Sequence, residues 1–405
     1  MKILYLMPRS PEPATYGAQL RVHYLLQRLA YHNEVTVACF GDAGDAEKIS
    51  SAIKIPPERV YVLPKPWGAR HRRLGQLYAH VSNMSFLQLA SCSVKMQQTI
   101  DQILAKDNFD IVFEEFAMMG WYSLKTNALK VLDAHNVEND NFRRIAQHAG
   151  LFKKWHYNHE YKHLFEEERR AYRKQDLLFV TSTRDKEIID EFASEVPKVV
   201  LPNGVDTSYF VPKDVQPEPN SLVFTGLMKY VPNYDGVLYF LDEIFPMILK
   251  EIPDVKFYIV GSQPPETLHR RASENIIVTG FVDDVRPYVW RSKAFVVPLR
   301  MGGGTRLKVV EAMAMKKPVI STSIGCEGIE VQSGKNILIA DKPAKFAQNV
   351  IDVLRDKTHH REIAENGHKL AISHYDWSII GETMETELER FYKRHTEHLS
   401  RNIQP

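Results

Sequence analysis

Cysteine is scarce in this 405-residue chain. Its three cysteines (Cys39, Cys92 and Cys326) are odd in number and far apart, without the paired spacing of a zinc site or a disulfide framework. An excess of one charge is also missing, because 52 lysines and arginines stand against 50 aspartates and glutamates. That balance excludes a generally basic, nucleic-acid-binding protein, so an anionic partner must be held by a local site.

Long apolar runs are absent as well. No uninterrupted stretch of about 18 apolar residues could span a bilayer. The apolar segment 3–7 is too short for a signal-peptide core. We therefore expect a cytoplasmic protein, either free or peripheral at the inner face of the membrane. At roughly 150 residues per domain, the length predicts two or three domains.

Short apolar runs alternate with longer stretches of helical period, which is typical of parallel strands joined by crossover helices. In the first half we predict strands at 3–7, 35–40, 60–63, 111–113, 130–133, 177–181 and 198–201. In the second half we predict strands at 221–225, 256–260, 276–278, 294–298, 319–321 and 337–339. The fold class is therefore α/β with parallel sheets.

Turn residues and prolines crowd the segment 202–220, which lacks a periodic pattern and marks a linker. It divides the chain into a first domain at 1–205 and a second at 206–376. Two such βαβ halves are expected to face each other across a cleft that receives the carboxyl ends of both sets of strands. Apolar residues at helical spacing predict a final helix at about 377–405, packing back onto the first domain.

The segment 296–311 is the most informative motif. An apolar strand leads into three consecutive glycines at 302–304, and good helix formers follow directly from residue 305. Free N–H groups and the positive end of a helix dipole at such a junction favour an anion. Arg306 and Lys308 add two cations that suit a diphosphate, and Glu311 can accept hydrogen bonds from sugar hydroxyls. A tight turn before a solvated helix is the alternative; neither the P-loop pattern nor the dinucleotide fingerprint fits.

Two further groups of polar residues lie at predicted strand ends. His135 follows the strand at 130–133, and a neutral histidine can hydrogen-bond a sugar hydroxyl. Glu114 and Glu115 follow the strand at 111–113. Adjacent residues of an extended chain face opposite sides, so both carboxylates cannot act on one bond. We interpret one as buried or capping and the other as an acceptor contact.

Two other segments carry polar side chains in patterns that allow more than one interpretation. His156, His159 and His163 share a helical face at metal-like intervals, but the surrounding segment is densely charged, so we favour a solvated face over a metal site. Residues 65–73 mix a tryptophan with four cations. This segment could bind the phosphate of a lipid-linked acceptor or a membrane surface, with an exposed loop as the default interpretation.

These motifs occur in the order seen in the retaining glycosyltransferases of family 4, which the chain resembles over almost its whole length. In that family two glutamates separated by seven residues stand at the glycine loop. Glu311 matches the second, followed here as there by Ala-Met-Ala, whereas the first falls on Gly303. The chain thus looks like the branch in which Gly-Gly-Gly-Thr-Arg-Leu-Lys replaces the first glutamate, with backbone amides taking over contacts to the donor sugar.

The resemblance implies the GT-B fold, two facing Rossmann-like domains, and a set of site residues. The catalytic residues it implies are His135, Arg306 and Lys308. The donor-binding residues are Gly17, Gly226, Val282, Gly302, Gly303, Gly304, Thr305 and Glu311. Arg21, Asn203 and Glu115 are expected at the acceptor or the hinge.

The implied activity is transfer of a hexosyl unit from a nucleotide diphosphate sugar to an acceptor hydroxyl with retention of configuration. The acceptor is a glycan, a lipid-linked molecule or a small molecule. No metal cofactor is expected, since Arg306 and Lys308 replace it and no Asp-x-Asp triplet is present. The alternatives are a non-hydrolysing nucleotide-sugar 2-epimerase and a sugar-nucleotide-binding subunit that has lost catalysis.

Overall fold

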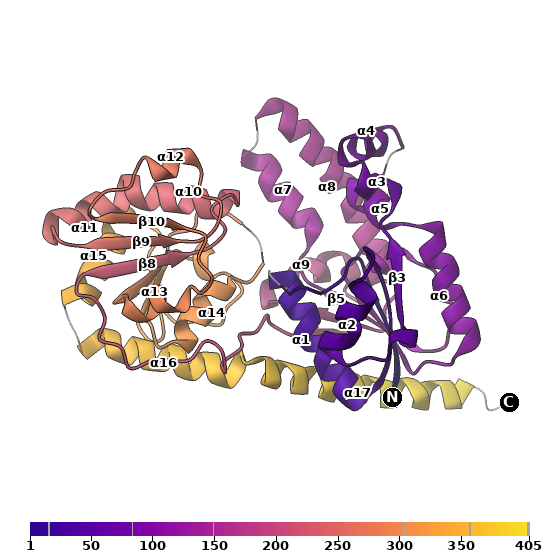
Figure 1. Cartoon of the computed structure of the whole chain (residues 1–405). Coiled ribbons are helices and arrows are strands. Elements are labelled where there is room, and N and C mark those ends of the chain that lie inside the picture. The colour runs from indigo at the N-terminus through magenta and orange to yellow at the C-terminus, as the bar shows by residue number, and fades with distance from the viewer. Residues whose placement is uncertain (15–16, 83, 149, 303, 356–357, 403–405) are drawn as a thin grey trace. The chain divides into compact units, whose positions relative to one another are not determined.

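The computed structural model describes residues 1–14, 17–82, 84–148, 150–302, 304–355 and 358–402 (Figure 1). They form two compact units. Unit 1 comprises Met1–Leu201 and Gly381–Pro405, and unit 2 comprises Pro202–Ile380. The predicted boundaries were residues 205 and 376, where the structure divides the chain after Leu201 and Ile380. None of the described helices is long and apolar enough to cross a bilayer.

Unit 1 is built on a seven-stranded parallel sheet in the order β3-β2-β1-β4-β5-β6-β7. Its strands are β1 (Lys2–Met7), β2 (Glu34–Gly41), β3 (Val60–Pro64), β4 (Ile111–Glu115), β5 (Leu129–Ala134), β6 (Leu177–Val180) and β7 (Lys198–Val200). In the centre of the sheet Ile3 of β1 lies opposite Val35 of β2 and Ile111 of β4. Every residue of β4 is buried, as expected for a parallel strand covered on both faces.

The helices of unit 1 connect and cover these strands (Figure 1). They are α1 (Gly17–His32), α2 (Asp45–Ile53), α3 (Trp67–Arg70), α4 (Arg72–Ser82), α5 (Phe86–Ser91), α6 (Val94–Lys106), α7 (Glu138–His148), α8 (Leu151–Tyr172) and α9 (Thr183–Ala193), with 3-10 turns η1 (Pro57–Arg59) and η2 (Met119–Trp121). The long C-terminal helix α17 (Trp377–Asn402) begins in unit 2 and continues in unit 1. Within unit 1 its Glu385 accepts a hydrogen bond of 2.6 Å from Arg28 Nε of α1.

Unit 2 holds a six-stranded parallel sheet in the order β10-β9-β8-β11-β12-β13. Its strands are β8 (Ser221–Thr225), β9 (Lys256–Val260), β10 (Ile276–Gly280), β11 (Ala294–Val297), β12 (Val319–Ser321) and β13 (Leu338–Ile339). Its helices are α10 (Val231–Tyr239), the π-helix η3 (Phe240–Ile244), α11 (Phe245–Glu251), α12 (Glu266–His269), α13 (Arg286–Arg291), α14 (Leu307–Ala314), the 3-10 turn η4 (Ile324–Cys326), α15 (Pro343–Arg355) and α16 (Thr358–His374). All the predicted strands are thus present, most with ends shifted by one or two residues.

The strand order reverses once in each sheet, between β1 and β4 in unit 1 and between β8 and β11 in unit 2. Crossover helices leave such a switch point on opposite faces of the sheet, which opens a crevice at the carboxyl ends of the two strands. Ligands of doubly wound folds bind in that crevice. The same topology therefore marks one candidate binding edge in each unit.

Candidate functional site

The structure divides the predicted site residues between the two units. Unit 1 contains Gly17, Arg21, Glu115 and His135. Unit 2 contains Asn203, Gly226, Val282, Gly302, Gly304, Thr305, Arg306, Lys308 and Glu311. Gly303, which takes the place of the first glutamate, lies outside the described residues.

The glycine loop of unit 2 connects β11 to α14 at the switch point. Gly302 and Gly304 have φ values of 125° and 71°, a region that glycine adopts without steric cost. Arg306 is the N-cap of α14, with φ −86° and ψ 88°, so the helix begins at Leu307, two residues later than predicted. The Arg306 Nη1 group donates 2.7 Å to the Gly304 carbonyl. The arginine thus folds back against the loop that precedes it.

A second part of this site forms where β8 ends. Lys308 Nζ donates 2.8 Å to Oδ1 of Asn233 and lies 4.0 Å from the centre of the Phe224 ring. A Cβ atom at Gly226 would stand 2.9 Å from that Nζ and 2.7 Å from Nδ2 of Asn233. Only glycine allows this close approach, which brings together Gly226 and Lys308, two residues predicted to bind the donor diphosphate.

Sequence reasoning missed Asn233. Its Nδ2 donates 3.0 Å to the Leu227 carbonyl, so the side chain joins the loop after β8 to Lys308. The available signal was its place in the first turn of α10, directly after Pro232, because proline is favoured at the start of a helix. Its contact with α14 depends on packing between segments 75 residues apart, which the sequence pattern does not reveal.

The electrostatics of this site favour an anion. Burial and the neighbouring Arg306 lower the pKa of Lys308 to about 7. Burial raises the pKa of Glu311 to about 7, and Lys308 opposes that rise. The hydroxyl of Thr305 is buried and has no hydrogen-bond partner among the described residues. Two neighbouring cations and a hydroxyl without a described partner thus lie together at the glycine loop, a combination that suits an anion.

Two other predicted residues lie apart from these contacts. Val282 is half-buried, two residues after Gly280 at the carboxyl end of β10. Gly261 N donates 3.2 Å to the Gly280 carbonyl, and a Cβ at Gly261 would overlap the Gly226 carbonyl, so these strand ends are tightly packed. Asn203 lies just after the point where the chain leaves unit 1.

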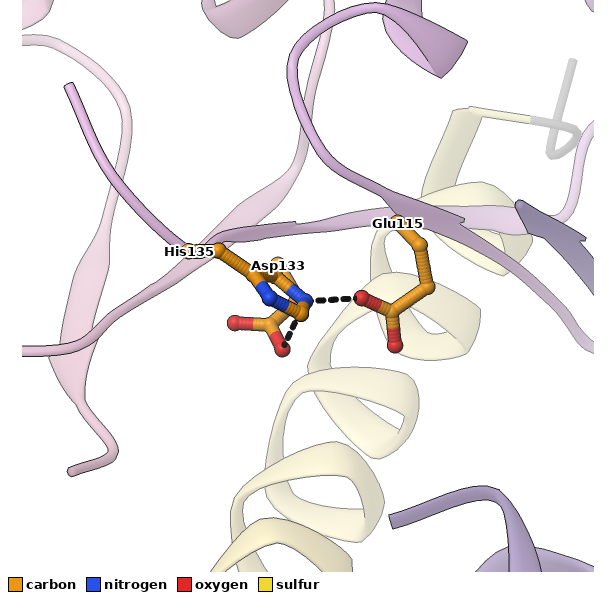
Figure 2. A group of neighbouring side chains, drawn as sticks. All are labelled: Glu115, Asp133 and His135. Atoms are coloured by element: carbon orange, nitrogen blue, oxygen red, sulfur yellow. Dashed lines mark hydrogen bonds and ion pairs between the residues drawn. The ribbon is translucent and has the colours of Figure 1, made fainter. Parts of the chain in front are cut away.

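In unit 1, His135 directly follows β5 and joins a buried polar network (Figure 2). Its Nε2 makes a short contact with a carboxylate oxygen of Glu115 and lies 3.5 Å from Oδ2 of Asp133. Tyr5 OH donates to the other Glu115 oxygen. The imidazole also stacks on the ring of Phe116, with 3.8 Å between ring centres. His135 is therefore held in one orientation by Glu115 of β4, by Asp133 of β5 and by Phe116, which directly follows β4.

Arg21 and Glu115, which were predicted at the acceptor or the hinge, are both buried and bound to other residues of unit 1. Arg21 donates to both oxygens of Asp133 from Nε and Nη2, at 2.7 and 2.8 Å. The side chains of Arg21, Asp133 and Glu115 are all 0% exposed. Arg21 is thus paired with Asp133, and Glu115 is bound by His135 and Tyr5. Burial also raises the pKa of Glu115, while the charge of His135 opposes that rise.

Glu115, Asp133 and His135 present ligand atoms that all lie within 4.8 Å of one another, close enough for a metal ion. Each carboxylate already has a donor, however, since Arg21 binds Asp133 and Tyr5 binds Glu115. A guanidinium beside the carboxylates repels a cation. The three residues therefore fit a hydrogen-bonded cluster that positions His135 better than they fit a metal centre.

The other carboxylate of the pair, Glu114, faces the opposite side of β4. It accepts 2.7 Å from Nε2 of Gln175, and burial raises its pKa to about 8. Both glutamates lie within β4 and not after it as predicted. The strand continues for two residues beyond the apolar run at 111–113. Glu114 and Glu115 thus lie on opposite faces of the sheet, as predicted for adjacent residues of an extended chain.

The three histidines of α8 do not form the solvated face that we favoured. Nε2 of His80 in α4 lies 2.9 Å from Nδ1 of His156, and the His80 ring lies 4.1 Å from that of His159. Burial and the neighbouring histidines lower the pKa of His159 to about 4. The segment 65–73 also differs from the expected exposed loop, since much of it lies in α3 and at the start of α4. The contacts of His80 in α4 with His156 and His159 explain the first difference.

A pocket of about 680 Å³ opens at the carboxyl ends of β1, β2 and β3 in unit 1. Among the residues that line it are Arg9, Ser10, Asp42, Lys65, Arg72 and Phe86. Lys65 Nζ donates 2.8 Å to Asp42 across this pocket wall. The mixture of cations, carboxylates, a hydroxyl and apolar surface suits a polar ligand.

Comparisons with known proteins support a glycosyltransferase. Residues 219–356 match the family described as glycosyl transferases group 1. Over 396 residues the chain is 26% identical to an uncharacterized 44.6 kDa protein in the cps region of Klebsiella pneumoniae, covering 93% of this chain and 96% of that protein. Over 168 residues it is 24% identical to the capsular polysaccharide biosynthesis glycosyltransferase CapM of Staphylococcus aureus, covering 39% of this chain and 44% of CapM.

Two solved structures share the fold over nearly the whole chain. Sucrose-phosphate synthase from Thermosynechococcus elongatus has a TM-score of 0.69 at 15% identity, covering 97% of this chain and 100% of that one. Anabaena HepE in complex with UDP has a TM-score of 0.69 at 16% identity, covering 96% of this chain and 100% of that one. The fold is that of GT-B glycosyltransferases. The matches support a glycosyltransferase of the group 1 family and do not favour the epimerase or the inactive subunit.

Proposed function

We propose that this protein is a retaining hexosyltransferase that takes its sugar from a nucleotide diphosphate donor and acts in capsular polysaccharide or related glycan synthesis. The single observation that carries the donor assignment is the glycine loop of unit 2, where Arg306, Lys308 and Asn233 converge with Gly226. The UDP complex of HepE and the capsular relatives support the same assignment.

The diphosphate binds at the carboxyl edge of β8 and β11 in this proposal. The N-terminal amides of α14 and the positive end of its dipole face a phosphate oxygen, and Arg306 and Lys308 neutralise the charge. In this proposal, charge neutralisation by Arg306 and Lys308 takes the place of a divalent metal ion. The hydroxyl of Thr305 supplies a further donor. Glu311 accepts from hydroxyls of the sugar.

Transfer breaks the bond between the anomeric carbon and the diphosphate oxygen, and the electron pair leaves with the diphosphate. The acceptor hydroxyl forms the new bond on the same face of that carbon, and its proton passes to the departing phosphate oxygen. No protein base is needed. His135, fixed through Nε2 by Glu115, offers Nδ1 to a sugar hydroxyl and so holds the reacting geometry.

The first test is a nucleotide screen. We expect one of UDP, GDP and ADP to raise the thermal unfolding temperature, because a ligand at about 100 times its Kd stabilises the folded state by about 2.7 kcal/mol. With the matching nucleotide sugar, proton NMR of the product should show the anomeric configuration of the donor. Absence of stabilisation by every nucleotide would refute the donor site, and an inverted product would refute retention alone.

The pH dependence of nucleotide binding is a second prediction. Lys308 and Glu311, each with a pKa of about 7, both lose a proton as the pH rises through 7, and both losses disfavour an anionic ligand. UDP binding should therefore take up protons, and its affinity should fall several-fold between pH 7 and pH 9. Calorimetry in buffers of different ionisation enthalpy measures the uptake.

Matched variants separate the two groups. Lys308→Met and Glu311→Gln should each remove part of the proton uptake. Lys335→Met, which removes an exposed lysine from the same unit, should leave it unchanged. Proton uptake that persists undiminished in both site variants would show that the nucleotide binds elsewhere.

A further inference from the structure

Helix α4 carries its large apolar side chains on the side that faces away from the core. Leu74, Leu77, Tyr78 and Val81 follow the i, i+3, i+4, i+7 spacing of a single helix face. Their exposed fractions lie between 52% and 83%. A helix that only served the core of unit 1 would turn these side chains inward.

The inner side of α4 packs through small residues. A Cβ atom at Gly75 would stand 2.8 Å from the Gly68 carbonyl of α3 and 3.1 Å from the ring of Phe86 in α5. Ala79, one turn later, is completely buried. Gly75 and Ala79 thus pack α4 against unit 1, while the larger apolar side chains of the helix remain exposed to solvent.

Two tryptophans extend this surface. Trp67 of α3 is 52% exposed and lies edge-on to the Tyr78 ring, and Trp155 of α8 is 65% exposed and stacks on His80 of α4. We call the resulting surface the α3–α4 face. It consists of Trp67, Leu74, Leu77, Tyr78, Val81 and Trp155.

The segment that forms α3 and α4 carries charge of one sign. Between Glu58 and Asp101 the sequence contains no acidic residue, although the chain as a whole is balanced. Arg70, Arg72 and Arg73 are exposed beside the apolar side chains, and none of them forms an ion pair with a described residue. Apolar and aromatic side chains flanked by arginines are the composition of a helix that lies in a membrane interface.

We infer that the α3–α4 face docks unit 1 on a bilayer containing anionic lipids. The apolar side chains enter the boundary between headgroups and acyl chains, tryptophan and tyrosine lie at headgroup level, and the arginines meet lipid phosphates. A protein partner would bury these apolar residues equally well, but the unrelieved positive charge favours a surface of phosphates.

The same surface borders the pocket of unit 1. Lys65, Ala69 and Arg72, from the segment that forms α3 and the start of α4, line that pocket. A docked unit 1 therefore brings the pocket mouth to the lipid headgroups. Resting on the proposed function, this indicates that the acceptor is lipid-linked, with its phosphate beside Arg72.

Vesicle sedimentation of the full chain tests the docking. We expect binding to phosphatidylcholine vesicles containing phosphatidylglycerol, weaker binding without the anionic lipid, and a decrease at high salt. Leu77→Glu with Val81→Glu should lower the partition coefficient about tenfold or more, since two apolar contacts are lost and two negative charges are added. Arg72→Ala with Arg73→Ala should lower mainly the preference for phosphatidylglycerol.

The matched control is Tyr31→Glu with Val94→Glu, which adds the same charges at exposed apolar positions of unit 1 that do not belong to this face. It should bind vesicles as the wild type does. Thermal unfolding and UDP titration of each variant show whether fold and donor site are intact. Failure of UDP binding alone would refute the donor site and leave the docking standing.

Two outcomes overturn the inference. One is a negative vesicle test: the wild-type protein does not bind the anionic vesicles, or Leu77→Glu with Val81→Glu binds them as tightly as the control variant does. The other is light scattering that shows a dimer of wild-type protein, broken by Leu77→Glu with Val81→Glu, without vesicle binding. The face would then pair two copies of the chain.

Discussion

Replacing Arg306 with alanine is expected to lower glycosyl transfer by about 100- to 1000-fold, the range typical for removing a preorganised donor from a developing negative charge. The arginine is buried against the glycine loop, where water replaces its charge poorly. Turnover with the nucleotide sugar identified by the screen is the measurement. Arg306→Lys should recover part of the loss, because lysine keeps the charge but not the planar guanidinium.

A purely structural role of Arg306 makes a different prediction. Its hydrogen bond to the Gly304 carbonyl could serve only to shape the loop. In that case the alanine variant would unfold at a lower temperature and lysine would not restore activity. Arg271→Ala is the control, since Arg271 is an exposed arginine of the same unit, paired with Asp242. Near wild-type transfer by a folded Arg306→Ala protein would contradict the diphosphate assignment.

The largest effect on stability is expected at Arg21. Arg21→Ala leaves the carboxylate of Asp133 buried without its cation, which typically costs about 3–5 kcal/mol in the free energy of unfolding. Urea unfolding followed by circular dichroism measures this cost. Arg28→Ala removes an arginine from the same helix, but its pair with Glu385 is partly exposed, so the loss there should be about 1 kcal/mol or less.

A double variant separates the buried charge from simple loss of packing. Arg21→Met with Asp133→Asn keeps most of the volume and leaves no unpaired charge, so it should be more stable than Arg21→Ala. Equal stability of these two proteins would show that packing, and not the carboxylate, sets the cost. A loss below about 1 kcal/mol in Arg21→Ala would contradict the burial of the ion pair.

The strands could be predicted because parallel strands covered on both faces appear in a sequence as continuous apolar runs. Carboxylates interrupt that pattern, so the prediction ended β4 at residue 113 although the strand continues through Glu115. The burial of Glu115 depends on Tyr5 and His135, which come from other strands. No local pattern in the sequence could show that partnership.

The candidate donor site was predictable where backbone chemistry dominates, and less so where side chains meet. Consecutive glycines before a helix indicate a loop without reference to distant residues, and Gly302 and Gly304 of that loop both have positive φ. Asn233 and the outward face of α4 depend on which side of a helix packs inward. Spacing alone defines a helix face, but it does not say where that face points.

Helix α17 runs without interruption across the point where the contact pattern divides the chain. Its Met384 and Leu388 are completely buried in unit 1, and Tyr392 donates to Asp110 at the start of β4. Unit 1 is therefore assembled from two separate segments of the chain, with the whole of unit 2 between them in the sequence. Residues of the segment 381–402 must therefore be translated before unit 1 can complete its core, whereas unit 2 needs no residue after Ile380.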